Sequence, residues 1–151
     1  MAVLTELALD AQVSVRGELQ EGFPVEPNTI ASVHGRTVLW LGPDEWLVLG
    51  GREEDYRGAA AAVDVSANRV VFELTGDGVP GLLAGGCALD LDPSVFVPGR
   101  CAQTLLARAQ VVLVRPDADR FLVLVRSSFA PYLRAWLADA LKGSTSLRSS
   151  R

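Results

Sequence analysis

Two apolar stretches, each interrupted by a Pro-Asp turn, constrain the fold of this chain more than any other feature. The first reads VLWLGPDEWLVL at residues 38–49, and the second reads VVLVRPDADRFLVL at residues 111–124. Aliphatic runs on both sides of Pro-Asp are typical of paired strands, because proline presets φ and aspartate hydrogen-bonds to its own backbone. Each stretch therefore predicts a β-hairpin.

The two hairpin sequences can be overlaid on each other. Residues 38–44 match residues 111–117, and, after a turn that is longer by two residues in the second copy, residues 46–49 match residues 121–124. An alternating segment precedes each hairpin, at 13–19 and at 69–75, and a helix is expected after each. This pattern predicts an α+β fold of two pseudo-repeated β-α-β-β-α halves, with antiparallel sheets covered by helices.

The remaining segments are assigned from periodicity and from glycine and proline. The expected elements are a helix within residues 1–12, a strand at 11–19, a loop at 20–28, a helix with an acidic first turn at 52–62, a short helix at 80–84, an alternating segment at 88–91, one long strand or two at 101–115, a strand at 120–126 and a final helix at 129–142 capped by Ser128. We expect a single domain over residues 1–142 and a flexible polar tail over residues 143–151.

Composition narrows the class of protein. Hydrophobic residues make up 49% of the 151 residues, and the formal net charge is −4. A globular domain fits these values, whereas a nucleic-acid-binding protein needs clustered positive charge. No apolar run approaches the ~20 residues of a membrane span, and the N-terminus lacks the basic start of a signal peptide. We therefore expect a cytoplasmic protein in which Cys87 and Cys101 are free thiols.

Asp44 and Glu45, at the tip of the first hairpin, permit two interpretations. They are either a carboxylate pair for acid–base chemistry or the polar end of a turn. Acid–base work needs two carboxylates in a cleft with separated pKa values. Because Pro116-Asp117 occupies the matching place in the second hairpin, a structural cause explains both copies, and we favour the turn.

The three tryptophans are the largest side chains of the sequence. Trp40 and Trp46 flank the first turn, where they meet across the hairpin or lie on either side of the sheet, and Trp136 belongs to the final helix. Core packing is the expected role, and tryptophan is also enriched in subunit interfaces. The sequence leaves open which of the three lies at an interface.

The other candidate residues have plain structural explanations. Asp90 and Asp92 share one face of an expected strand, but a metal site needs further oxygen ligands, so a turn capped by Asp92 or Ser94 is preferred. Cys87 would need His34 beside it to act as a nucleophile, so a buried thiol and a turn histidine are expected instead. Residues 76–81 (GDGVPG) match G-x-G-x-x-G by letters, yet the helix that follows is too short for a dinucleotide site.

The segment 63–114 carries a resemblance to a known family. It contains VDVS, a strand, TG, a short helix PGLL, then LDP and VPGRCAQTLLA, with LGPDEWLVL upstream and SFAPYLRAWL near the end. This frame resembles the gamma subunit of heterotetrameric sarcosine oxidase. The resemblance implies a non-catalytic subunit that assembles with alpha, beta and delta subunits, which hold FAD, FMN, NAD and zinc and use tetrahydrofolate. We assign no catalytic, cofactor-binding or metal-ligating residue to this chain.

A more distant likeness joins the chain to the folate-binding domain of the aminomethyltransferase family. Asp64-Val65-Ser66 and Leu82-Leu83 match two elements of that family. Its essential aspartate falls near Leu113 and Val114, and an aliphatic side chain can neither orient a folate amine nor stabilise positive charge. A folate-binding or one-carbon-transfer module with Asp64, Glu73 or Asp90 in its pocket is the alternative function. A cofactor-assembly factor is weaker still, because that family's K-G-C-Y-x-G-Q-E signature is absent.

Overall fold

The computed structural model describes residues 1–9 and 11–149, with side chains described as far as Gly143. Its strands are β1 Val3–Leu7, β2 Gln12–Arg16, β3 Ile30–Val33, β4 Arg36–Gly42, β5 Glu45–Leu49, β6 Ala61–Asp64, β7 Arg69–Thr75, β8 Arg100–Leu106, β9 Ala109–Asp117 and β10 Arg120–Arg126. The helices are α1 Val79–Ala84 and α2 Ala130–Ser149, and two 3-10 turns are η1 Glu53–Tyr56 and η2 Ser127–Phe129.

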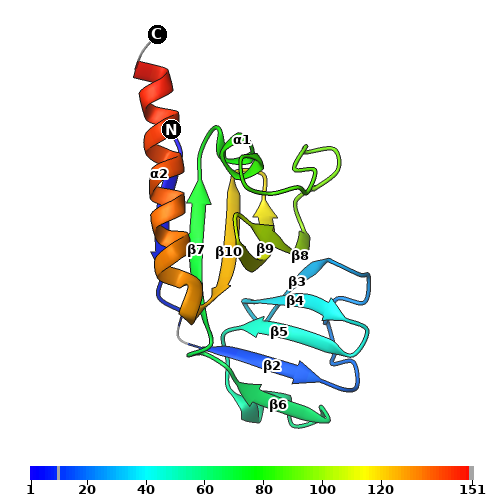
Figure 1. The fold of residues 1–151 in the computed structure, drawn as a ribbon. Helices are drawn as coiled ribbons and strands as arrows, with labels where there is room; N and C mark the ends of the chain where they lie inside the picture. The colour runs from blue at the N-terminus through cyan, green and yellow to red at the C-terminus, as the bar shows by residue number, and fades with distance from the viewer. Residues whose placement is uncertain (10, 150–151) are drawn as a thin grey trace.

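The strands form two antiparallel sheets of five strands each. Sheet A has the order β1-β7-β10-β9-β8, and sheet B has the order β3-β4-β5-β2-β6. In Figure 1, sheet A stands upright beside the long helix α2, and the strands of sheet B run across the lower part of the molecule. The fold is therefore α+β, with two antiparallel sheets and few helices.

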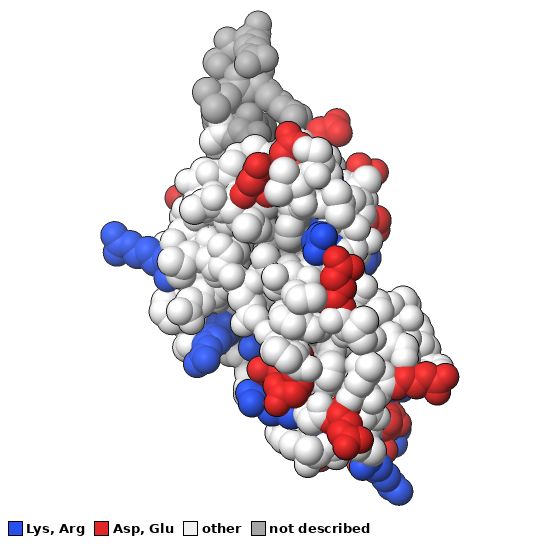
Figure 2. Space-filling view, turned by 90° about the vertical axis from the view of Figure 1, so that its right-hand side faces the viewer, with Lys and Arg blue, Asp and Glu red and all other residues white. Residues whose placement is uncertain are grey.

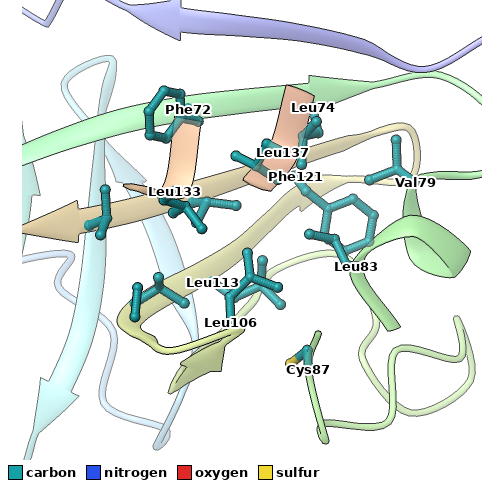
Figure 3. Packing of buried hydrophobic residues seen from close by; sticks show 14 of the residues in the cluster. Phe72, Leu74, Val79, Leu83, Cys87, Leu106, Leu113, Phe121, Leu133 and Leu137 are labelled. Atoms are coloured by element: carbon teal, nitrogen blue, oxygen red, sulfur yellow. The ribbon is translucent and has the colours of Figure 1, made fainter. Parts of the chain in front are cut away.

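Three apolar clusters hold these layers together. The first lies between sheet A and the helices, where Phe72, Leu113 and Phe121 meet Leu133 and Leu137 of α2 (Figure 3). The second lies between the sheets and joins Leu39 and Leu47 of sheet B to buried side chains of sheet A, namely Val71, Cys101, Val112, Val114, Leu122 and Leu124. The third covers the outer face of sheet B with Phe23 and Tyr56. Both faces of each sheet are thus at least partly covered.

Backbone hydrogen bonds also join the two sheets at one edge. Thr29, just before β3, bridges to Arg100 of β8. The N–H of Ile30 donates to the Gly99 carbonyl at 2.9 Å, and the N–H of Cys101 donates to the Asn28 carbonyl at 2.9 Å. The unpaired N–H and C=O groups of an edge strand can pair with another chain, and these bonds satisfy some of them where β3 and β8 meet.

The expected hairpins are confirmed, with β4 paired to β5 and β9 paired to β10. The strand β7, the short helix α1 and the strand β2 also lie where the sequence placed them. Each of these elements carries its signal locally, as alternation, a turn or a glycine stop.

Three expectations about local structure are wrong, and one strand was not expected. Residues 1–12 contain the strand β1, which pairs with β7, instead of a helix. The helix expected at 52–62 is only the 3-10 turn η1, followed by the strand β6, which pairs with β2. Residues 88–91 form no strand, and the strand β3 at Ile30–Val33 was not expected. Strands β1 and β6 each pair with a strand that is distant in the sequence. The periodicity of a short segment does not indicate such pairing.

The final helix also differs from its expected bounds. It starts after the turn η2 and continues past Lys142 to Ser149, through most of the segment expected as a tail. Its last turns extend beyond the end of sheet A in Figure 1. The last two residues of the expected tail, 150 and 151, lie outside the described residues. The extension carries no amphipathic pattern that would predict it, because that segment lacks apolar core residues.

Candidate functional site

Asp44 and Glu45 lie at the tip of the β4–β5 hairpin, as the turn interpretation predicted. Pro43 and Asp44 form the turn, and Gly42 pairs with Glu45. The Asp44 carbonyl accepts a hydrogen bond from the Gly17 N–H at 2.9 Å. The Glu45 carboxylate pairs with Arg16 of β2 at 3.2 Å. Both residues therefore serve contacts between neighbouring strands and turns.

The tryptophans occupy two different environments. Trp46 is 2% exposed, donates its indole N–H to the Pro24 carbonyl at 2.9 Å and meets the ring of Phe23 edge to face. Trp40 lies directly opposite Trp46 in the hairpin register but is only half-buried. It borders a mainly apolar hollow of about 320 Å³ between the β4–β5 turn and the loop before β3. Trp46 is thus a core residue, and Trp40 reaches the surface.

Trp136 packs partly against the first cluster, on the face of α2 that meets sheet A. Its ring lies so close to Gly86 that a side chain there would collide with it. The glycine after α1 is therefore required for this contact. The role of Trp136 is therefore packing between α1, α2 and the β8–β9 turn.

The structure separates the acidic candidates. Asp64, on β6, accepts hydrogen bonds from the Ser66 hydroxyl and N–H, which lower the pKa of its carboxyl group. Glu73, on β7, pairs with Arg120 at 3.5 Å. Asp90 and Asp92 lie in a loop, where Asp92 accepts from the Ser94 hydroxyl and N–H, so the pKa of Asp92 is also lowered. Among the described residues, no group of three His, Cys, Asp or Glu residues is placed to hold a metal ion.

The histidine and the cysteines also lie apart. His34 lies in the two-residue turn between β3 and β4, as expected. Cys87 belongs to the core between sheet A and α2, where its sulfur lies 3.9 Å from the Thr104 hydroxyl (Figure 3). Cys101 is buried between the sheets and donates its S–H to the Trp40 carbonyl. Burial raises the pKa of the Cys101 thiol to about 11, so this thiol stays protonated near neutral pH.

The glycine-rich segment before α1 forms a turn. Gly76 and Gly78 adopt φ values of 98° and 83°, which glycine tolerates without strain. The helix that follows, α1, has six residues. A helix this short with a proline near its start does not provide the phosphate site of a dinucleotide-binding motif, so the residues present do not fit such a cofactor.

Two arginines that were not among the candidates from the sequence border a polar hollow. Arg69 starts β7 and Arg126 ends β10, and the two lie directly opposite each other in the register. They line a hollow of about 400 Å³ with Gln103, Leu105 and Gln110, among others, and the lining includes no carboxylate. A second hollow of about 330 Å³ shares both arginines and includes Asn68, Ser127 and Ser128.

Sequence alone carried only a weak signal for this pair. Each arginine is the charged end of an apolar strand, which is an ordinary position for a charged residue. Their position opposite each other depends on the pairing of β7 with β10, two strands that lie far apart in the chain. Figure 2 shows acidic and basic side chains interspersed over mostly uncharged surface on one face, so no extended basic surface marks the molecule there.

The two antiparallel five-stranded sheets form a small α+β domain, in which the candidate catalytic residues are dispersed among turns and cores. Residues 7–143 match the model of the sarcosine oxidase gamma subunit family. The chain belongs to this family.

Individual relatives agree with the family match. The chain is 34% identical to the sarcosine oxidase subunit gamma of Arthrobacter sp., over 92% of this chain and 79% of that protein. It is 33% identical to the same subunit of Corynebacterium sp. strain P-1, over 91% of this chain and 79% of the relative. Among solved structures, it is similar to a chain of the heterotetrameric sarcosine oxidase from Corynebacterium sp. U-96 in complex with pyrrole 2-carboxylate. That match has a TM-score of 0.85 and 30% identity, over 94% of this chain and 84% of the other.

Proposed function

We propose that this chain is a non-catalytic gamma subunit of a heterotetrameric sarcosine oxidase, in which it assists assembly or stability. The observation that carries the proposal is the similarity over 94% of the chain to a chain of such a complex. Alpha, beta and delta subunits are the proposed partners, in the cytoplasm. The oxidative demethylation of sarcosine to glycine, with FAD, FMN, NAD, zinc and tetrahydrofolate, belongs to those subunits.

The described residues are consistent with a subunit that has no reaction of its own. The candidate nucleophile and base, Cys87 and His34, lie in different layers, and the carboxylates considered for folate chemistry are engaged with separate neighbours. Leu113 and Val114, near the position of the aspartate in the folate-dependent enzymes, are 1% and 0% exposed. They fill the core on the two faces of β9 and leave no polar atom for a ligand.

We also propose that the two halves are related as an internal repeat of the folate-binding-domain type. The hairpin β4–β5 pairs with β2, and the hairpin β9–β10 pairs with β7, always antiparallel. Both hairpins have a register irregularity next to the turn. In this interpretation, each half contributes its leading strand, β1 or β6, to the sheet of the other half.

Co-expression with the alpha, beta and delta subunits tests the proposed function. We expect the chain to co-purify with the flavoprotein subunits at equal stoichiometry, as measured by native mass spectrometry. We expect the isolated chain to be colourless and inactive toward sarcosine. A chain that remains a monomer beside the three folded partners would contradict the proposal, and heat released on titration with a reduced folate would favour the folate-binding alternative.

A further inference from the structure

We propose that the surface around Arg69 and Arg126 binds an extended acidic segment of a partner subunit. This inference rests on the proposed function, because the partner is another chain of the same complex. We call this surface the arginine groove and define it by the two hollows that share Arg69 and Arg126.

Neither guanidinium group has a carboxylate of a described residue within 4 Å. The ion pairs between described side chains include neither Arg69 nor Arg126, and the charge of Glu45 acts on Arg69 only from beyond the 4 Å of an ion pair. Other arginines of the chain do pair with carboxylates within 4 Å, namely Arg16, Arg36, Arg100, Arg120 and Arg134. Like charges directly opposite in a sheet are destabilising, so an added carboxylate would relieve a repulsion that the isolated chain retains.

The Arg69 guanidinium has already lost part of its hydration. Burial lowers the pKa of the Arg69 guanidinium, and the neighbouring charge of Arg126 lowers it further. Glu45 acts in the opposite direction, but its carboxylate pairs with Arg16 instead. A partly desolvated guanidinium binds a carboxylate more strongly than a fully hydrated one, because less water must be removed and the local dielectric is lower.

The face of sheet A that meets sheet B is exposed at one end. Leu124 and Val112 are register partners and belong to the apolar cluster between the sheets. Two residues further along, Arg126 and Gln110 share that face, since side chains alternate along a strand. There, Arg126 and Gln110 are exposed, and Leu105, the register partner of Gln110, is 52% exposed. Sheet B therefore leaves this end of sheet A uncovered.

The shape of the arginine groove favours a chain segment as the occupant. The groove crosses β8, β9, β10 and β7, a width of roughly 14 Å at the usual strand spacing, which about four residues of extended chain would span. It then continues to Asn68 and Ser128. Small-molecule sites are usually concave and bury most of the ligand, whereas much of this lining is exposed. A carboxylate on an extended segment can reach both arginines, with Leu105 as an apolar contact.

The test compares the affinity of three forms of the chain for the co-expressed remaining subunits. They are the wild type, the double variant Arg69→Gln and Arg126→Gln, and a control variant Arg57→Gln, whose arginine is exposed and lies outside the groove. We expect the double variant to bind roughly 100-fold more weakly at low salt, and the control to bind like wild type. We also expect the affinity of the double variant to depend less on salt than that of wild type.

A thermal melt of each isolated chain separates lost binding from lost folding. Because the double substitution removes a like-charge pair, we expect its melting temperature to equal or exceed that of wild type. Wild-type chain that fails to assemble would overturn the proposed function itself. If the wild type and the double variant assemble equally well, the proposed role of the arginine groove is wrong, and the proposed function stands.

A titration with inorganic phosphate tests whether the arginine groove binds a free anion instead of a chain segment. Phosphate could stabilise the wild type but not the double variant, while both assemble equally well. In that case the groove is a small-anion site, and the proposal is wrong. If assembly is weakened in the double variant and phosphate competes with the partner, the docking of an acidic segment is supported.

Discussion

Burial determines the chemistry of Cys101 and the role of Arg115. The Cys101 thiol lies between the two sheets, where burial raises its pKa to about 11. Arg115 is 4% exposed and donates to the Phe96 carbonyl at 2.9 Å and to the Ala118 carbonyl at 3.0 Å, while its guanidinium lies over the ring of Phe121. Carbonyl groups and an aromatic face thus replace a carboxylate as the partners of a buried charge.

The raised pKa of Cys101 predicts a pH dependence of stability. In the unfolded chain the thiol ionises near its ordinary value of 9.0, whereas in the folded chain it ionises near 11. Between these values the unfolded state releases a proton that the folded state keeps, so stability is lost as pH rises. We expect the free energy of unfolding to fall by about 2 kcal/mol across this window, as measured by urea denaturation.

The variant Cys101→Ala is the control for this pH effect. Lysine and tyrosine also titrate at alkaline pH, and they are present in both proteins. The difference between the two stability curves isolates the thiol, and it should shrink as pH rises from 9 to 11. Parallel curves over this range would show that the thiol is not buried as described.

Individual elements differ in how far their own sequence specifies them. The strands β4, β5, β9 and β10 were predictable because aliphatic residues surround a turn in each hairpin. The strands β1 and β6 were not, because they depend on β7 and β2 for hydrogen bonds. The short turn between β3 and β4 depends on His34 and Gly35, which both have positive φ, at 51° and 75°.

This turn predicts opposite effects for two substitutions. Positive φ at both central residues is the requirement of a type I′ turn, for which Asn-Gly is the preferred pair. We expect His34→Asn to raise the free energy of unfolding by about 0.5 kcal/mol, and Gly35→Ala to lower it by about 1 kcal/mol, by urea denaturation. A large loss of stability in His34→Asn would mean that the imidazole has a role beyond the turn.

The whole molecule depends on the cluster between the two sheets. Leu39 and Leu47 of sheet B are 0% and 1% exposed and pack against sheet A. The bridge from Thr29 to Arg100 adds a backbone connection at one edge. Neither sheet buries its inner face without the other, so we infer that the two sheets unfold together.

The variant Leu39→Ala tests this coupling. We expect a loss of about 3 kcal/mol, because a buried leucine is replaced by a cavity, with one transition in both far-UV circular dichroism and Trp fluorescence. Leu19→Ala is the matched control; Leu19 is 53% exposed, and its loss should change stability by less than about 0.5 kcal/mol. Separate transitions for the two signals would contradict the coupling.

The sequence by itself determined the α+β class, the two hairpins and the family resemblance, because alternation, turn residues and motif letters are local properties. It also favoured structural explanations for Asp44, His34 and Cys87, and the structure places all three in the expected turns or core. Only the tertiary structure decided which strands complete each sheet, and that Arg69 and Arg126 lie opposite each other. Strand pairing joins residues that are distant in the chain. The energy of such contacts depends on both strands, so the periodicity of either strand alone does not predict it.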